Sequence, residues 1–171
     1  CGGGGVSRAF VKEGSGELEP LPDLPVSPHP NYVTPRGLAD LRARLLARQG
    51  ELTLLRARAE RLDKLPEAAA ERDIRYLEAR LRTAILVEAA APHSSEVGFG
   101  CRVVVDQNGA RAVYEIVGED EADAGLGRIA PQSPLARALI GAVVGDVVVW
   151  RRPSGVVELE ILEVGPIDPG A

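Results

Sequence analysis

The sequence has no methionine, two cysteines, two histidines and few aromatic residues, which make up 4% of its 171 positions. Aliphatic side chains must therefore form most of any core. Cys1 and Cys101 are too few for a disulfide framework and too far apart for zinc-finger spacing. No apolar run approaches the roughly 20 residues that a membrane-spanning helix needs. These absences argue against small disulfide-rich, zinc-finger and membrane-spanning proteins, and the cysteine usage fits a reducing, cytoplasmic compartment.

The chain also lacks residues grouped to carry chemistry of their own. His29 and His93 stand beside prolines in loop-like segments, without the nearby thiols or carboxylates of a metal site. The glycine run at residues 2–5 precedes no strand and helix, so it does not predict a phosphate-binding loop. We therefore expect no enzyme activity, and no metal or cofactor held by this chain alone.

Residues 1–33 predict an arm rather than a domain. Prolines are dense between residues 20 and 30 and favour an extended, polyproline-like backbone. We expect this Gly/Pro-rich arm to be flexible or strapped to the rest of the chain. We interpret the opening Cys1 and its glycine run as a leader translated in frame, with Val6 as the start read from a GTG codon.

Residues 34–90 predict a coiled-coil hairpin of two antiparallel helices. Thr34 is a good N-cap, and Pro35 is favoured at the first helical position. The first helix is expected to end near residues 63–65, since Pro66 disfavours helix in the residue before it. A tight turn then leads into a second helix that stops before Pro92. Apolar residues at heptad spacing form two matching seams: Leu38, Leu41, Leu45, Leu52, Leu55, Ala59 and Leu62, then Ala70, Ile74, Leu77, Leu81 and Ala84.

From residue 98 to 165 the pattern changes to that of a small antiparallel sheet domain. Strands are expected at 101–105, 110–117, 147–150 and 156–164. The Asn108-Gly109 pair predicts a hairpin turn with positive φ angles. A short helix at 134–140 is expected to be capped by Ser133, and Cys101 to be a buried thiol. The predicted fold class is thus α+β, a helical hairpin followed by a sheet that carries one short helix.

Charge is distributed unevenly between the two predicted parts. Residues 36–88 contain 12 basic and 9 acidic side chains, a net charge of +3, whereas residues 99–171 contain 6 basic and 11 acidic ones, a net charge of −5. The hairpin could therefore approach a polyanion at close range. The overall charge of −5 argues against tight binding of free nucleic acid.

Several stretches in the second half follow one ordered pattern. Residues 114–123 read YEIVGEDEAD, residues 127–129 read GRI, residues 133–141 read SPLARALIG, and residues 144–146 read VGD. Residues 31–37, NYVTPRG, precede the predicted hairpin, and residues 7–10 read SRAF. Together these segments resemble the GreA/GreB family of transcription elongation factors, with the strongest likeness after Phe99.

The resemblance implies a C-terminal domain with an FKBP-like fold that lacks isomerase activity. It implies docking at the rim of the RNA polymerase secondary channel, on a coiled coil of the largest subunit, with the hairpin inside the channel. There an acidic tip helps to hold a second Mg²⁺ at the polymerase active site, where backtracked nascent RNA is cleaved. The docking residues that it implies are Asp120, Glu121, Ala122, Asp123, Ser133, Pro134 and Leu135.

The predicted tip departs from the family pattern. Its two acids, Asp63 and Glu67, lie one residue further apart than in the family, with Pro66 between them and no Asn after them. The hairpin is also shorter by roughly two heptads, about one in each helix, which shortens its reach by about 10 Å. Near the tip, Arg56, Arg58 and Arg61 form a candidate RNA-proximal basic face.

Four functional hypotheses follow. The first is a polymerase-binding elongation regulator that stimulates cleavage. The second is a non-cleaving relative that occupies the channel and competes with Gre factors or alters pausing, similar to the short-coiled Rnk proteins. The departures at the tip favour the second slightly. A free nucleic-acid-binding protein would use the arginine-rich first helix. A peptidyl-prolyl isomerase would need a pocket lined by aromatic side chains, and Phe99, Tyr114 and Trp150 are too few for one.

Overall fold

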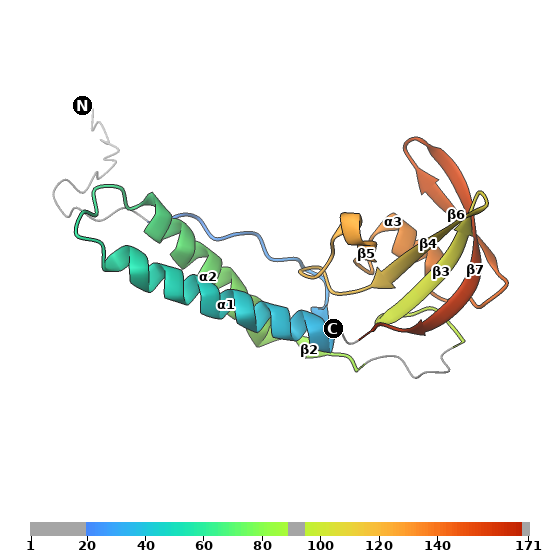
Figure 1. Cartoon of the computed structure of the whole chain (residues 1–171), viewed down its shortest axis with the longest axis horizontal. Coiled ribbons are helices and arrows are strands. Elements are labelled where there is room, and N and C mark those ends of the chain that lie inside the picture. Colours follow the sequence, from blue (N-terminus) through green and yellow to red (C-terminus); the bar gives the residue numbers. More distant parts are fainter. Residues whose placement is uncertain (1–19, 89–94, 169–171) are drawn as a thin grey trace, which may run out of the picture.

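The structure, a computed structural model, describes residues 20–88 and 95–168. It has the α+β organisation predicted from the sequence (Figure 1). A long helical hairpin extends from one side of a curled five-stranded sheet. None of the helices in these residues is long and apolar enough to cross a membrane.

The hairpin consists of α1 (Pro35–Arg56) and α2 (Leu65–Thr83). As predicted, Thr34 caps α1, because its side chain accepts a hydrogen bond from the backbone N–H of Gly37 (2.9 Å). Leu41 and Leu77 are buried between the helices and stabilise their pairing through apolar contact.

The predicted end of the first helix is wrong. Helix α1 stops at Arg56, and residues 57–64 form a loop in place of the predicted tight turn. Leu62 is 95% exposed there, since α2 starts only at Leu65 and offers it no apolar partner. The side chain of Arg58 donates to the carbonyl of Leu55 (3.2 Å), which satisfies an acceptor that the ending helix leaves open.

Residues 20–30 form an extended strap along the hairpin (Figure 1). Arg75 of α2 fastens it by donating to the carboxylate of Asp23 (2.6 Å) and to the carbonyl of Leu21 (2.8 Å). Leu24 lines a hollow together with Tyr76 and residues of both helices. Of the two expectations for the arm, flexible or strapped, residues 20–30 are strapped to the hairpin. Residues 1–19, with the proposed start at Val6, lie outside the described residues.

The base of the hairpin is clamped by a parallel pair of strands that the sequence analysis did not predict. Strand β1 (Tyr32–Val33) enters the hairpin and β2 (Ile85–Leu86) leaves it. The N–H of Ile85 donates to the carbonyl of Asn31 (2.8 Å). The Asn31 side chain in turn donates to the carbonyl of Arg80 (2.8 Å), so the chain that enters the hairpin is bonded to the chain that leaves it.

The sheet contains β3 (Cys101–Gln107), β4 (Ala110–Ile116), β5 (Arg128–Ile129), β6 (Val147–Arg152) and β7 (Gly155–Pro166), in the order β5-β4-β3-β7-β6. The predicted turn at Asn108 and Gly109 joins β3 to β4, and both residues have positive φ. The prediction of an antiparallel sheet needs one correction, because β5 pairs with β4 in parallel. At two residues, β5 is too short to show a strand pattern.

The core of this domain lies between the concave face of the sheet and α3 (Pro134–Leu139). Ser133 caps α3 as predicted, since its hydroxyl accepts from the N–H of Ala136 (3.3 Å). Leu139 is fully buried, and so is the thiol of Cys101, again as predicted. A short 3-10 helix, η1 (Ala124–Leu126), precedes β5.

Candidate functional site

The predicted docking residues begin in the acidic loop, residues 118–123, which follows β4. The loop turns tightly because the N–H groups of Glu121 and Ala122 both donate to the carbonyl of Gly118 (3.1 Å each). Asp123 then pairs with Arg128 through two backbone hydrogen bonds (2.9 and 3.0 Å) and leads the chain into β5. This geometry holds the first acids of the loop against the base of the hairpin.

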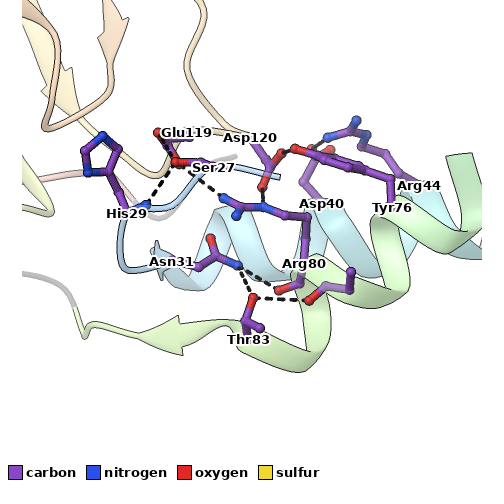
Figure 2. A network of polar contacts seen from close by, with 11 residues as sticks. Ser27, His29, Asn31, Asp40, Arg44, Tyr76, Arg80, Thr83, Glu119 and Asp120 are labelled. Atoms are coloured by element: carbon purple, nitrogen blue, oxygen red, sulfur yellow. Dashed lines mark hydrogen bonds and ion pairs between the residues drawn. The ribbon is translucent and has the colours of Figure 1, made fainter. Parts of the chain in front are cut away.

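Asp120 binds α2 (Figure 2). One carboxylate oxygen accepts from the hydroxyl of Tyr76 (2.5 Å), and the other accepts from Nε of Arg80 (2.6 Å). The side chains of Arg80 and Asp120 are only 2% and 10% exposed. Burial and the hydrogen bond to Asp120 raise the pKa of Tyr76 to about 12. The Asp120 carboxylate is thus already engaged within the molecule.

Glu121 makes the corresponding contact with the start of α1. Its carboxylate accepts from the hydroxyl of Thr34 and from Nε of Arg36, each at 2.5 Å. Arg36 also donates to Glu115 (3.1 Å). Burial opposes the charge of Arg36, but the hydrogen bonds to Glu115 and Glu121 outweigh this effect and raise its pKa. The carboxylate also lies at the helix N-terminus, where the dipole of α1 favours a negative charge.

The remaining predicted docking residues differ in their exposure. Ala122 and Asp123 are exposed, although the Asp123 side chain accepts from the N–H of Gly125 (3.0 Å). Pro134 is exposed and Ser133 is half-buried at the start of α3. Leu135 is buried in the core and can support this surface only from beneath.

At the tip, each predicted acid is engaged locally. The Glu67 carboxylate forms a two-point ion pair with Arg61 (2.8 and 2.5 Å), and hydrogen bonding by Arg61 lowers the pKa of Glu67. The Asp63 carboxylate accepts from the N–H of Leu65 (3.0 Å) at the start of α2. Within residues 20–88 and 95–168, no three His, Cys, Asp or Glu side chains are grouped to hold a metal ion. In this arrangement the two carboxylates do not form a metal site.

The residues of the predicted basic face also form hydrogen bonds and ion pairs within the hairpin. Arg56 pairs with Glu71 of α2 (2.8 Å), and Arg58 donates to the carbonyl of Asp63 (3.3 Å). Even so, Arg56, Arg58 and Arg61 are all exposed. An open hollow of about 470 Å³ lies beside Arg56 and Arg61. Its lining residues are Pro20, Arg56, Arg61, Lys64, Glu67, Ala68 and Glu71.

The sequence analysis missed the partners of the acidic loop. These partners are Arg36 of α1 and Tyr76 and Arg80 of α2, which lie 85, 44 and 40 positions from the acids that they contact. Arg80 is a buried charge one turn after the buried Leu77 in α2, and a seam pattern alone does not reveal it. The one available signal was the charge contrast between the basic hairpin and the acidic domain.

The comparisons with known proteins agree with the sequence pattern. Residues 91–166 match the family described as "Transcription elongation factor, GreA/GreB, C-term". Transcription elongation factor GreA of Pseudomonas putida is 43% identical over 97 residues, which cover 55% of this chain and 61% of that protein. GreA of Pseudomonas aeruginosa is 46% identical over 97 residues, with the same two shares. The chain thus matches less than two thirds of the length of these relatives.

Two solved structures align with most of this chain at low identity. GreA factor homolog 1 (Gfh1) of Thermus thermophilus is 24% identical and aligns over 80% of this chain and 99% of its own, with a TM-score of 0.38. A GreA/GreB elongation factor from Nitrosomonas europaea is 20% identical and aligns over 79% of this chain and 98% of its own, with a TM-score of 0.39. Residues 91–166 are thus similar in sequence to the C-terminal domain of the GreA/GreB elongation factors.

Proposed function

We propose that this protein is an accessory factor that binds bacterial RNA polymerase at its secondary channel and modulates transcription elongation in the cytoplasm. The observation that carries this proposal is the match of residues 91–166 to the C-terminal domain of the elongation factors. A helical hairpin stands in front of this domain and is bonded to it at the acidic loop. The hairpin supplies the part that would enter the channel.

The docking surface would be formed by the exposed part of the acidic loop and the start of α3. Ala122, Asp123 and Pro134 are accessible there, and Ser133 is half-buried beside Pro134. A negative loop suits a basic helical partner, such as a coiled coil of the largest polymerase subunit, because opposite charges speed encounter and fix orientation. Leu135 would hold this surface in place from the core.

At the tip, assistance to a metal ion would require local rearrangement of the two acids. Glu67 is neutralised by Arg61, so a role beside the polymerase Mg²⁺ would first require this ion pair to open. Asp63 is exposed, but its carboxylate caps the start of α2. Arg56, Arg58 and Arg61 would face the nascent RNA within the complex, where their exposed guanidinium groups can approach its phosphates.

A transcript-cleavage assay tests the proposal. Backtracked elongation complexes receive saturating protein, or the double variant Asp63→Ala, Glu67→Ala. Cleavage that the variant abolishes would place these two acids at the reaction. Absence of cleavage, with inhibition of an added Gre factor, would show a competitor that occupies the channel. Absence of both effects would refute polymerase binding at this site.

A mobility-shift assay with free RNA provides the contrast to polymerase binding. We expect no shift at physiological salt, because the net charge of −5 opposes binding to phosphates. A shift that Arg56→Ala and Arg58→Ala reduce would support a free RNA-binding protein.

A further inference from the structure

The acidic loop touches both helices at once. Asp120 holds Tyr76 and Arg80 of α2, and Glu121 holds Arg36 of α1. A link to one helix alone would leave a pivot about that link. Two links to two different helices oppose rotation about either one. We call this set of five side chains the joint.

Close backbone packing reinforces the joint. A Cβ atom added at Gly118 would lie 2.4 Å from the carbonyl oxygen of Tyr32, and one at Gly37 would lie 2.7 Å from the carboxylate of Glu121. Both distances are shorter than real Cβ contacts. The backbone carbonyl of Tyr32 cannot yield easily, so position 118 requires glycine, whereas a side chain at position 37 would displace the Glu121 carboxylate. The ring of Tyr32 also contacts that of Phe99, with 5.8 Å between ring centroids. The base of the hairpin and the sheet domain therefore meet through apolar, polar and backbone contacts.

Small rotations at the joint become large displacements at the tip. Helix α1 has 22 residues and, at 1.5 Å per residue, is about 33 Å long. A rotation of about 10° at its base would move its far end by about 6 Å over that length. A misplacement of about 1 Å can lower a catalytic rate about 100-fold. An action of the tip at a distant site thus depends on how firmly the joint holds.

We propose that the acidic loop has two separate roles, divided along its sequence. Asp120 and Glu121 are positioning residues that fix the direction of the hairpin relative to the C-terminal domain, whereas Ala122 and Asp123 are left to meet the partner. The inference that the hairpin direction is fixed depends only on contacts within this chain. Its consequence for transcription rests on the proposed function.

A distance measurement tests the joint without polymerase. Spin labels are placed at Leu62→Cys in the tip loop and Val156→Cys in β7, where the native residues are 95% and 59% exposed. Cys1 is replaced by serine, and Cys101 is buried and stays unlabelled. We expect one narrow distance distribution, which at least doubles in width in Asp120→Asn, Glu121→Gln. The matched control is Asp123→Asn, which should retain the narrow distribution.

A second variant tests the same contacts without removing a charge, in case the first variant does not fold. Gly118→Ala keeps every charge but pushes the Tyr32 carbonyl away from the loop, so the mean distance should shift. Unchanged circular dichroism would show that the helices of each variant remain intact. If Asp120→Asn, Glu121→Gln and Gly118→Ala all retain the parent distribution, these contacts do not set the hairpin direction and the proposal is wrong.

Measurements with polymerase separate the two roles of the loop. The joint variant should still bind polymerase but lose its effect on elongation at saturation. Asp123→Asn should bind several-fold more weakly and regain the full effect at saturation. The reverse pattern would overturn the division of roles. If the parent protein does not bind polymerase, the proposed function fails, while the distance measurement still decides whether the joint exists.

Discussion

Removal of the Asp120 carboxylate should destabilise the protein more than removal of any exposed acid in the same loop. The variant Asp120→Ala leaves the guanidinium of Arg80, which is 2% exposed, without its nearest counter-charge. It also removes the acceptor of the Tyr76 hydroxyl. Loss of one partner from a buried ion pair commonly costs about 3 to 5 kcal/mol.

The magnitude should be lower than this here. Glu119 remains 3.4 Å from the Arg80 guanidinium and partly compensates for the lost charge. We therefore expect a loss of about 2 to 3 kcal/mol in the free energy of unfolding. For a chain of this size, that corresponds to a fall in Tm of about 4 to 12 °C.

Urea and thermal unfolding, followed by circular dichroism, would measure the effect. Asp120→Asn is the intermediate case, because it keeps an acceptor of the same shape and removes only the charge. Asp123→Ala is the control, since that side chain is exposed and accepts a single local hydrogen bond. Equal stability losses for Asp120→Ala and Asp123→Ala would refute the view that a buried charge pair ties the hairpin to the sheet domain.

Three further predictions concern the hairpin. Leu77→Ala should lower the free energy of unfolding by about 2 to 5 kcal/mol through the cavity it leaves, while Leu62→Ala at the exposed tip should change it little, as judged by urea unfolding. Tyr76 should ionise near pH 12 in a tyrosinate absorbance titration; its raised pKa stabilises the fold below about pH 10, a contribution lost between pH 10 and 12, and the late transition should be absent in Tyr76→Phe. The lowered pKa of Glu67 should stabilise the fold above about pH 4.5, a contribution lost as the pH falls through the folded value. Carboxyl NMR should show Glu67 titrating at a higher pH in Arg61→Ala, and an unchanged titration would contradict the ion pair.

Local chemistry was the part of the fold that the sequence made predictable. Thr34 and Ser133 are short polar caps followed directly by proline, and Asn108-Gly109 carries the positive φ angles that its turn requires. Each of these features depends on neighbours in the chain. Their positions could therefore be predicted without any knowledge of tertiary contacts.

Contacts between distant segments were not predictable in this way. Seam spacing extended the first helix to Leu62, although helix formation there would require an apolar partner that α2 does not provide. The partners of Asp120 and Glu121 lie far away in sequence. From the sequence alone, these two acids could equally belong to a solvent-exposed acidic loop. The resemblance pointed to this loop as a docking segment, which stays a prediction, and only the structure shows which of its acids face inward.

The parallel pairing of β1 and β2 holds the start and the end of the hairpin side by side. Its other end, the loop at residues 57–64, is free of the sheet domain in Figure 1. Matched deletions or additions of a heptad in both helices would therefore alter reach by about 10 Å without disturbing the clamp. Hairpin length can thus vary independently of the rest of the molecule, which gives evolution and protein engineering the same simple means of adjusting how far the tip extends.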